Sequence, residues 1–134
     1  MNFEFTIKGD DKPFIEITDR ELLSLQDLLN TINVYPDIHK VIQELKELRH
    51  LYPEYDELVE SKYNGYWDDD DLGKCFSVLG FEYVCVFIDN KNSVFIENEY
   101  QYPEIPRVKL KVDEFIKILE DWRDILKPYF EKNV

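Results

Sequence analysis

The hydrophobic periodicity of the chain changes along its length, and this pattern limits the folds that it can adopt. Apolar and polar residues alternate over residues 3–7, as in a half-buried strand. Over residues 22–48 the apolar residues recur every three or four positions, as on one face of a helix. Strand-like runs fill residues 75–112, and a last helical stripe covers residues 115–129. The predicted order is ββαα(α)ββββα, an α+β domain with a mostly antiparallel sheet.

Local signals define the first elements of this pattern. Glycine, aspartate and proline between residues 3–7 and 14–17 predict a turn, and hence an N-terminal hairpin. Thr18 and Glu21 fit a capping box, which predicts the start of the first helix. Pro36 suits the first position of a second helix. We therefore expect the two main helices to form a helical hairpin on one side of a sheet.

The second half is expected to be rich in strands. β-branched and aromatic residues concentrate in four runs separated by turn residues, which predicts an antiparallel meander. The runs are residues 75–79, 83–88, 93–97 and 107–112. The last run alternates basic with apolar residues, so one of its faces should be basic. Asp113 can cap a C-terminal helix, whose apolar stripe includes Trp122 as an expected core residue. Residues 64–65 and the aspartate run 68–71 are expected to be loop.

The composition indicates a single domain that spans residues 1–134. Apolar residues make up 44% of the chain, enough to bury a core, and no repeat or low-complexity linker divides it. The net charge is −13 and the pI is about 4.5. Such a chain should repel nucleic-acid phosphates and anionic membranes and attract cationic partners. Acidity that serves solubility alone is the alternative explanation.

We see no sequence signal for export, membrane insertion or a cofactor. The N-terminus lacks a basic region followed by an apolar one, and no apolar run approaches the roughly 18 residues of a membrane span, so we expect a cytoplasmic protein. Cys75 and Cys85 lie outside any CxxC pair and are distant in sequence from His39 and His50, which argues against a metal site. Both cysteines are expected to be reduced core residues.

Known catalytic motifs are not found either. The chain has no glycine-rich phosphate loop, GxSxG or HExxH, so we predict that it is not an enzyme. An EF-hand loop that starts at Asp68 would place Leu72 and Leu79 at positions that require oxygen ligands, so this motif is excluded. Weak binding of a divalent cation by the acidic loop remains an open alternative.

The clearest functional signal is the segment 53–71. It contains eight carboxylates and one base, Lys62, interleaved with large aromatic side chains. Tyr and Trp dominate the energetic centres of protein interfaces, and carboxylates attract cationic proteins. A second acidic and aromatic patch follows between residues 97 and 104. The predicted partner-binding residues are Tyr63, Tyr66, Trp67, Asp68, Asp69, Asp70 and Asp71 in the first patch, and Glu97, Glu99 and Tyr100 in the second.

A family resemblance comes from the end of the chain. The alternating strand 107–112 runs directly into a helix with Phe115 and Trp122 seven residues apart. This closing pattern, in a small acidic single domain, resembles that of immunity proteins of bacterial polymorphic toxin systems. The resemblance implies a cytoplasmic protein that binds and blocks a cognate toxin, commonly a basic nuclease. The residues that carry it serve packing, so no functional residue is transferred.

In such a mechanism the aspartates 68–71 would pair with basic residues of the nuclease cleft, while Tyr66 and Trp67 would fill its base pocket. A non-enzymatic structural or regulatory adaptor is the main alternative, and a small enzyme that uses carboxylates is the third. The sequence indicates neither the identity of the partner nor an oligomeric state.

Overall fold

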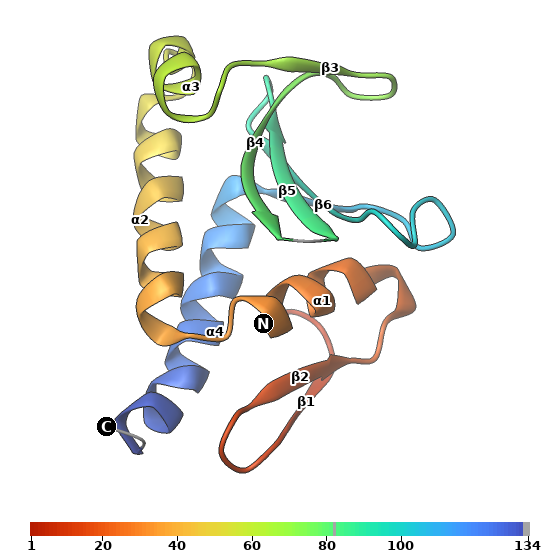
Figure 1. Ribbon diagram of the computed structural model, residues 1–134, viewed down its shortest axis with the longest axis vertical. Coiled ribbons are helices and arrows are strands. Elements are labelled where there is room, and N and C mark those ends of the chain that lie inside the picture. The colour runs from red at the N-terminus through yellow and green to blue at the C-terminus, as the bar shows by residue number, and fades with distance from the viewer. Residues whose placement is uncertain (82, 133–134) are drawn as a thin grey trace.

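The described residues form two antiparallel sheets and four α-helices, the predicted α+β arrangement (Figure 1). The computed structural model describes residues 1–81 and 83–132. The first sheet pairs β1 (Phe5–Lys8) with β2 (Phe14–Ile17). The second has the order β3 (Trp67–Asp69), β4 (Gly73–Phe81), β5 (Val84–Asp89), β6 (Ser93–Asn98) and β7 (Val108–Lys111). The helices are α1 (Leu23–Thr31), α2 (Tyr35–Leu51), α3 (Asp56–Lys62) and α4 (Val112–Lys132), and a 3-10 turn, η1 (Arg20–Leu22), precedes α1.

Side chains of α1 bind the edge of the N-terminal hairpin. β2 pairs with β1 along one of its edges. On the other edge, Asn30 accepts the N–H of Ile15 at 2.8 Å and donates to its carbonyl at 3.0 Å. Gln26 accepts the N–H of Ile17 at 2.7 Å. Because these bonds satisfy backbone groups that a third strand would otherwise pair, α1 takes the place of that strand.

The start of the first helix differs from the predicted capping box. Thr18 donates its N–H to the carbonyl of Glu4, so this residue still belongs to the hairpin. Asp19 has extended backbone, and its carboxylate accepts the N–H of Glu21 at 2.9 Å. Asp19, rather than Thr18, therefore caps the first turn.

The longest helices, α2 and α4, pack against each other (Figure 1). The helices of the predicted helical hairpin are α1 and α2, which are joined by residues 32–34. The main neighbours of α1 are the strands β2, β5 and β6, whereas α2 packs on α4. The two long helices pair because α2 and α4 carry long apolar stripes that cover each other, whereas the nine residues of α1 pack on the β1–β2 hairpin.

The centre of α4 is buried in the core. Trp122 is 0% exposed, as predicted, and its indole N–H donates to the carbonyl of Ile32 at 3.0 Å. The helix therefore fixes the C-terminal end of α1 as well as packing on α2. Among the described helices, none combines the length and the apolar character that crossing a membrane requires.

The five-stranded sheet has two different faces. Its core face packs with the helices and carries Phe76, Val84, Val86, Ile88, Val94, Ile96 and Val108. The opposite face, which we call the outer face, carries a separate buried cluster of Cys75, Phe87 and Phe95. These residues alternate with core residues along β4, β5 and β6, as successive side chains of a strand must. The predicted strands of the second half are confirmed within a few residues at their ends.

β3 corrects the expectation that the aspartate run is loop from its beginning. Trp67 pairs with Cys75, and Asp69 with Gly73, across a tight turn. Gly73 has a φ of +77°, a conformation that glycine adopts without strain. The sequence did not predict this short edge strand, because its residues are mostly polar and it forms through pairing with β4 rather than through its own β-propensity.

Candidate functional site

Trp67 lies on the outer face of the sheet, on the edge strand β3. Its ring meets that of Phe87 edge-on, with centroids 5.2 Å apart, and its indole N–H donates to the Ser77 hydroxyl at 3.2 Å. Phe87 in turn stacks on Phe95 at 5.7 Å. Trp67 is nevertheless 37% exposed. The ring is thus fixed in position and still accessible, as an interface anchor requires.

Arg107 joins the two edges of the sheet across the outer face. It precedes β7, yet its guanidinium donates to both carboxylate oxygens of Asp69 on β3, at 2.8 and 3.0 Å. Its Nε donates to Glu97 of β6 at 2.8 Å. It also lies 5.1 Å from the ring centre of Phe87 and 4.6 Å from that of Tyr102. With the Arg107 and Asp69 side chains only 16% and 9% exposed, this ion pair is internal to the fold.

The four consecutive aspartates have different environments. Asp69 turns inward, and besides Arg107 its carboxylate accepts two backbone N–H groups of the following turn at 3.1 Å. Hydrogen bonding to Arg107 is the main reason that the pKa of Asp69 lies below its usual range. Asp68, Asp70 and Asp71 are exposed. The charge of Asp69 is therefore already compensated within the chain, while the other three face solvent.

The second predicted patch lies next to the first because of Arg107. Glu97 is half-buried and paired with Arg107, whereas Glu99 is exposed. Tyr100 is 79% exposed, and its ring stacks on that of Tyr83 at 5.9 Å. The ion pairs of Arg107 thus connect two segments that are distant in sequence. We call the exposed residues of these two segments the acidic–aromatic face: Trp67, Asp68, Asp70, Asp71, Glu99 and Tyr100. Asp68 lies between Trp67 and Asp69 on β3, so its side chain is on the opposite side of the strand from theirs.

Among the described residues, one group places three potential metal ligands together. The ligand atoms of Cys85, Glu97 and Glu99 lie within 4.8 Å of one another. Burial, and then the hydrogen bond to Glu99, raises the pKa of the Cys85 thiol to about 12, so the thiol is protonated at neutral pH. Arg107 already binds Glu97. A metal ion bound here would have to displace the thiol proton and compete with Arg107 for Glu97. Cys85 is half-buried rather than in the core, whereas Cys75 is buried as predicted.

A cleft of about 470 Å³ opens beside the acidic–aromatic face. It lies where β4 continues past its pairing with β3, next to Ser77 and the β-bulge that follows this residue. Tyr63 and Tyr66 are among the residues that line it, and an ion pair between Glu44 and Lys62, 3.4 Å long, joins α2 to α3 beside it. We call this feature the Lys62 cleft.

The two tyrosines of the cleft also belong to the core. Their rings pack on Phe76, with centroids 5.5 Å away for Tyr63 and 5.8 Å for Tyr66. Tyr63 is only 9% exposed. The hydroxyl of Tyr66 donates to the carboxylate of Asp56, and the ammonium of Lys74 lies 4.3 Å from its ring centre. Of the three aromatic residues predicted in the first patch, Trp67 is therefore the exposed one.

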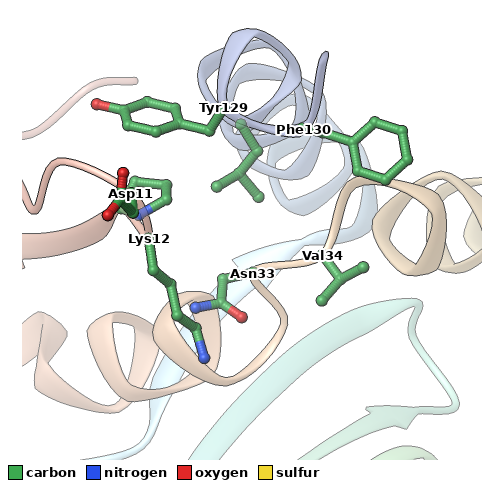
Figure 2. A pocket seen from close by; sticks show the side chains of 8 residues that line it. Asp11, Lys12, Asn33, Val34, Tyr129 and Phe130 are labelled. Atoms are coloured by element: carbon green, nitrogen blue, oxygen red, sulfur yellow. The ribbon is translucent and has the colours of Figure 1, made fainter. Parts of the chain in front are cut away.

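A smaller cavity, of about 240 Å³, lies at the other end of the molecule (Figure 2). It forms where the β1–β2 turn meets the α1–α2 connection and the last turns of α4. In Figure 2, Tyr129 and Phe130 point in opposite directions from the end of α4, and Lys12 extends beside Asn33. None of the partner-binding residues predicted from the sequence lines this cavity.

An apolar groove of about 480 Å³ lies between the N-terminal residues, α1, β7 and α4. Two carboxylates at this groove are paired within the chain. Asp113 binds Arg49 at 2.8 Å, and Asp121 binds Lys117 at 2.9 Å. These charges are therefore less available to a ligand than those of the acidic–aromatic face.

Sequence reasoning identified the acidic and aromatic residues but not the bases that organise them. Arg107 begins the run whose basic face was predicted, and Lys109 lies on that same face, 5.9 Å from the ring centre of Phe95. The acceptor of Arg107, Asp69, is 38 residues away in sequence and on the opposite edge of the sheet, so no local pattern reveals this ion pair. Lys62 carried a signal, as the single base of an acidic segment.

The arrangement as a whole suits the binding of a cationic surface. It combines a fixed, accessible indole ring with outward carboxylates and an adjoining aromatic cleft. We compared the chain with protein-family models, with curated proteins and with solved structures, and none of the three comparisons returned a significant match, so no family is assigned.

Proposed function

We propose that this protein binds and neutralises a cationic protein, of the class of basic nuclease toxins, through the acidic–aromatic face. The observation that carries the proposal is an exposed indole held rigidly next to a turn with outward carboxylates. Trp67 is fixed by Phe87 and Ser77, so little side-chain entropy is lost when a partner covers it. The carboxylates of Asp70 and Asp71, in the turn that follows β3, are exposed and able to meet basic side chains.

The charge of the whole chain supports the same function. A net charge of −13 creates a field that speeds encounter with a cationic protein and repels nucleic acid. A nuclease cleft is cationic because it must hold phosphates, so an acidic surface can occupy it in place of the substrate. The resemblance of the C-terminal strand and helix to immunity proteins points to this class of partner.

Internal ion pairing supports a preformed surface. Asp69 and Glu97 are bound to Arg107, which ties the turn after β3 to the segment before β7. The outward residues on both segments are thus held in one arrangement before a partner arrives. Preorganisation of this kind raises affinity by lowering the entropic cost of binding.

The test is capture of the partner with two baits. One is the wild-type chain, and the other carries Trp67→Ala with Asp68→Asn, Asp70→Asn and Asp71→Asn. We expect the wild-type bait to retain a basic protein whose activity it inhibits in that protein's own assay. The quadruple variant should lose at least about 2 kcal/mol of binding free energy, the loss typical of an interface hot spot.

Two further measurements separate this function from its alternatives. Association of the wild-type chain with the captured protein should slow by about tenfold from low to physiological salt, because salt screens steering between exposed charges. A folded quadruple variant that binds as tightly as wild type would show that the contact lies elsewhere. Capture of a partner that is acidic, or that keeps its full activity in the complex, would favour an adaptor.

A further inference from the structure

The Lys62 cleft already contains a cation of the chain itself. The ammonium of Lys62 lies 3.4 Å from a carboxylate oxygen of Glu44 and 5.8 Å from the ring centre of Tyr63. A carboxylate combined with an aromatic face is a recurrent binding site for an amino-acid cation. The contact is also weak, since the Lys62 side chain is 40% exposed and such exposed pairs stabilise little.

Carboxylates surround the cleft on several sides. The carboxylate oxygens of Glu60 lie 3.0 and 3.1 Å from the position that a Cβ at Gly65 would occupy, and Gly65 lines the cleft. Burial, and then the charges of Glu44 and Glu47, raises the pKa of Tyr63 to about 12. The acidic side chains around the cleft thus favour a positive charge within it.

The same molecule shows how an arginine binds in such surroundings. Arg107 forms two hydrogen bonds to Asp69 and lies over the rings of Phe87 and Tyr102. A planar guanidinium can stack on rings and bind a carboxylate through two N–H groups at once, whereas an ammonium acts as a point charge. The Lys62 cleft offers comparable elements, because Glu44 lines it together with Tyr63, Tyr66 and Trp67, and a cation already lies over the ring of Tyr63.

We propose that the Lys62 cleft receives an arginine side chain of the cationic partner and that Lys62 holds this position in the unbound protein. The proposal rests on the function proposed above and assigns it a specific pocket. On binding, the partner's guanidinium displaces the Lys62 ammonium from Glu44, stacks on the aromatic wall of the cleft, and brings the partner onto the neighbouring Trp67. The cleft volume of about 470 Å³ lies within the range of small-ligand pockets, roughly 300–1,000 Å³.

An octa-arginine peptide is the first probe, and an octa-lysine peptide is the second. Their affinities are measured by titration calorimetry for the wild-type chain, Lys62→Met and Lys91→Met. Lys91 is exposed in the β5–β6 turn, so both variants change the net charge equally and only one empties the cleft. We expect Lys62→Met to bind octa-arginine up to about fivefold more tightly than Lys91→Met does, the gain expected when a competing surface ion pair is removed.

A second pair of variants tests the carboxylate. Glu44→Gln should weaken octa-arginine binding more than Glu54→Gln, which removes an equal charge at an exposed position outside the cleft. Amide spectra recorded during the titration locate the peptide and show that each variant is folded. The indole N–H of Trp67 and the amides of Gly65 and Ser77 should shift first, and octa-lysine should bind more weakly.

The outcomes distinguish this inference from the broader proposal. Equal affinities of Lys62→Met and Lys91→Met, shifts confined to residues outside the cleft, or equal binding of both peptides would overturn the arginine pocket. The cationic-partner proposal would survive those results, because the peptide would still bind. If neither peptide bound the wild-type chain at low salt, both proposals would be overturned.

Discussion

Arg107 is the residue on which the outer face depends most. Its guanidinium compensates Asp69 and Glu97 and covers the ring of Phe87. A charge with this little exposure is tolerated because five N–H donors can be shared between two carboxylates. If either partner of the pair were removed, a nearly buried charge would remain without compensation.

Asp69 should make stability depend on pH in acid. Its pKa is lowered in the folded state, mainly by hydrogen bonding to Arg107, so its contribution is complete above the unfolded value of about 3.9 and is lost as the pH falls through the folded value. Asp69→Asn should therefore be destabilising at pH 7, toward the lower end of the roughly 3–5 kcal/mol that follow from breaking a buried pair. The difference from wild type should shrink as the pH falls below the unfolded value.

Urea unfolding of both proteins at neutral and acid pH measures this difference. Asp70→Asn is the matched control, since it removes the same charge from the exposed neighbour. A difference that stays constant from pH 7 to acid would contradict the assigned role of Asp69.

Residue types were predictable at this scale, whereas their pairing was not. The acidic and aromatic side chains are visible in the sequence as a cluster, and the basic face of β7 follows from its alternation. Which aspartate turns inward depends on the sheet order, since Asp69 and Arg107 lie near opposite edges of five strands. Tyr63 was equally hard to place from the sequence. It belongs to an acidic segment that suggests a surface, yet its ring packs on Phe76 in the core.

At the scale of elements, α4 connects the two halves of the core. It lies along α2, follows directly on β7 and, through Trp122, binds the end of α1. Its existence was predictable, because a long helical stripe has few alternative structures. The helix that packs against α4 was not predictable, because the period of an apolar stripe shows which side of a helix is buried but not which helix covers it.

Trp122→Ala should destabilise the protein by about 3–5 kcal/mol, through lost burial and the cavity that remains. The carbonyl of Ile32 would also lose its indole donor. Trp122→Phe is the matched control, since it keeps most of the apolar volume and should cost less. Unfolding in urea gives both values. A fully stable alanine variant would show that the ring is not part of the core.

β3 illustrates where prediction of the elements failed. Its three residues have the composition of a loop, and they form a strand because Gly73 reverses the chain onto β4. The capping error has a similar origin, since Thr18 suits a cap but the hairpin uses its N–H. In both cases a contact with another strand outweighs a local signal.

In the whole molecule, most of the buried core lies apart from the surface that we propose for recognition. The helices and the core face of the sheet contain most of the buried apolar side chains, while the outer face carries the exposed ring of Trp67 and the ion pairs of Arg107. Twenty-nine acidic residues against sixteen basic ones leave the free chain repelling itself. The acidity that would attract a partner should therefore weaken the isolated fold.

This self-repulsion can be measured without a partner. Adding sodium chloride should raise the melting temperature of the wild-type chain by several degrees, because screening weakens repulsion among exposed charges. Asp68→Asn with Asp70→Asn and Asp71→Asn should melt higher at low salt and gain less from added salt. Thermal unfolding followed by circular dichroism is the measurement. A wild-type melting temperature that falls with salt would mean that attractive ion pairs dominate.

The bonds from α1 to β2 also bear on how the protein avoids self-association. An uncovered strand edge is a template on which another chain can add a strand and begin to aggregate. Asn30 binds the outward N–H and carbonyl of Ile15, and Gln26 binds the N–H of Ile17. These backbone groups are therefore not available to an incoming strand. Two amide side chains on a short helix thereby make this edge of the hairpin a poor template for strand addition.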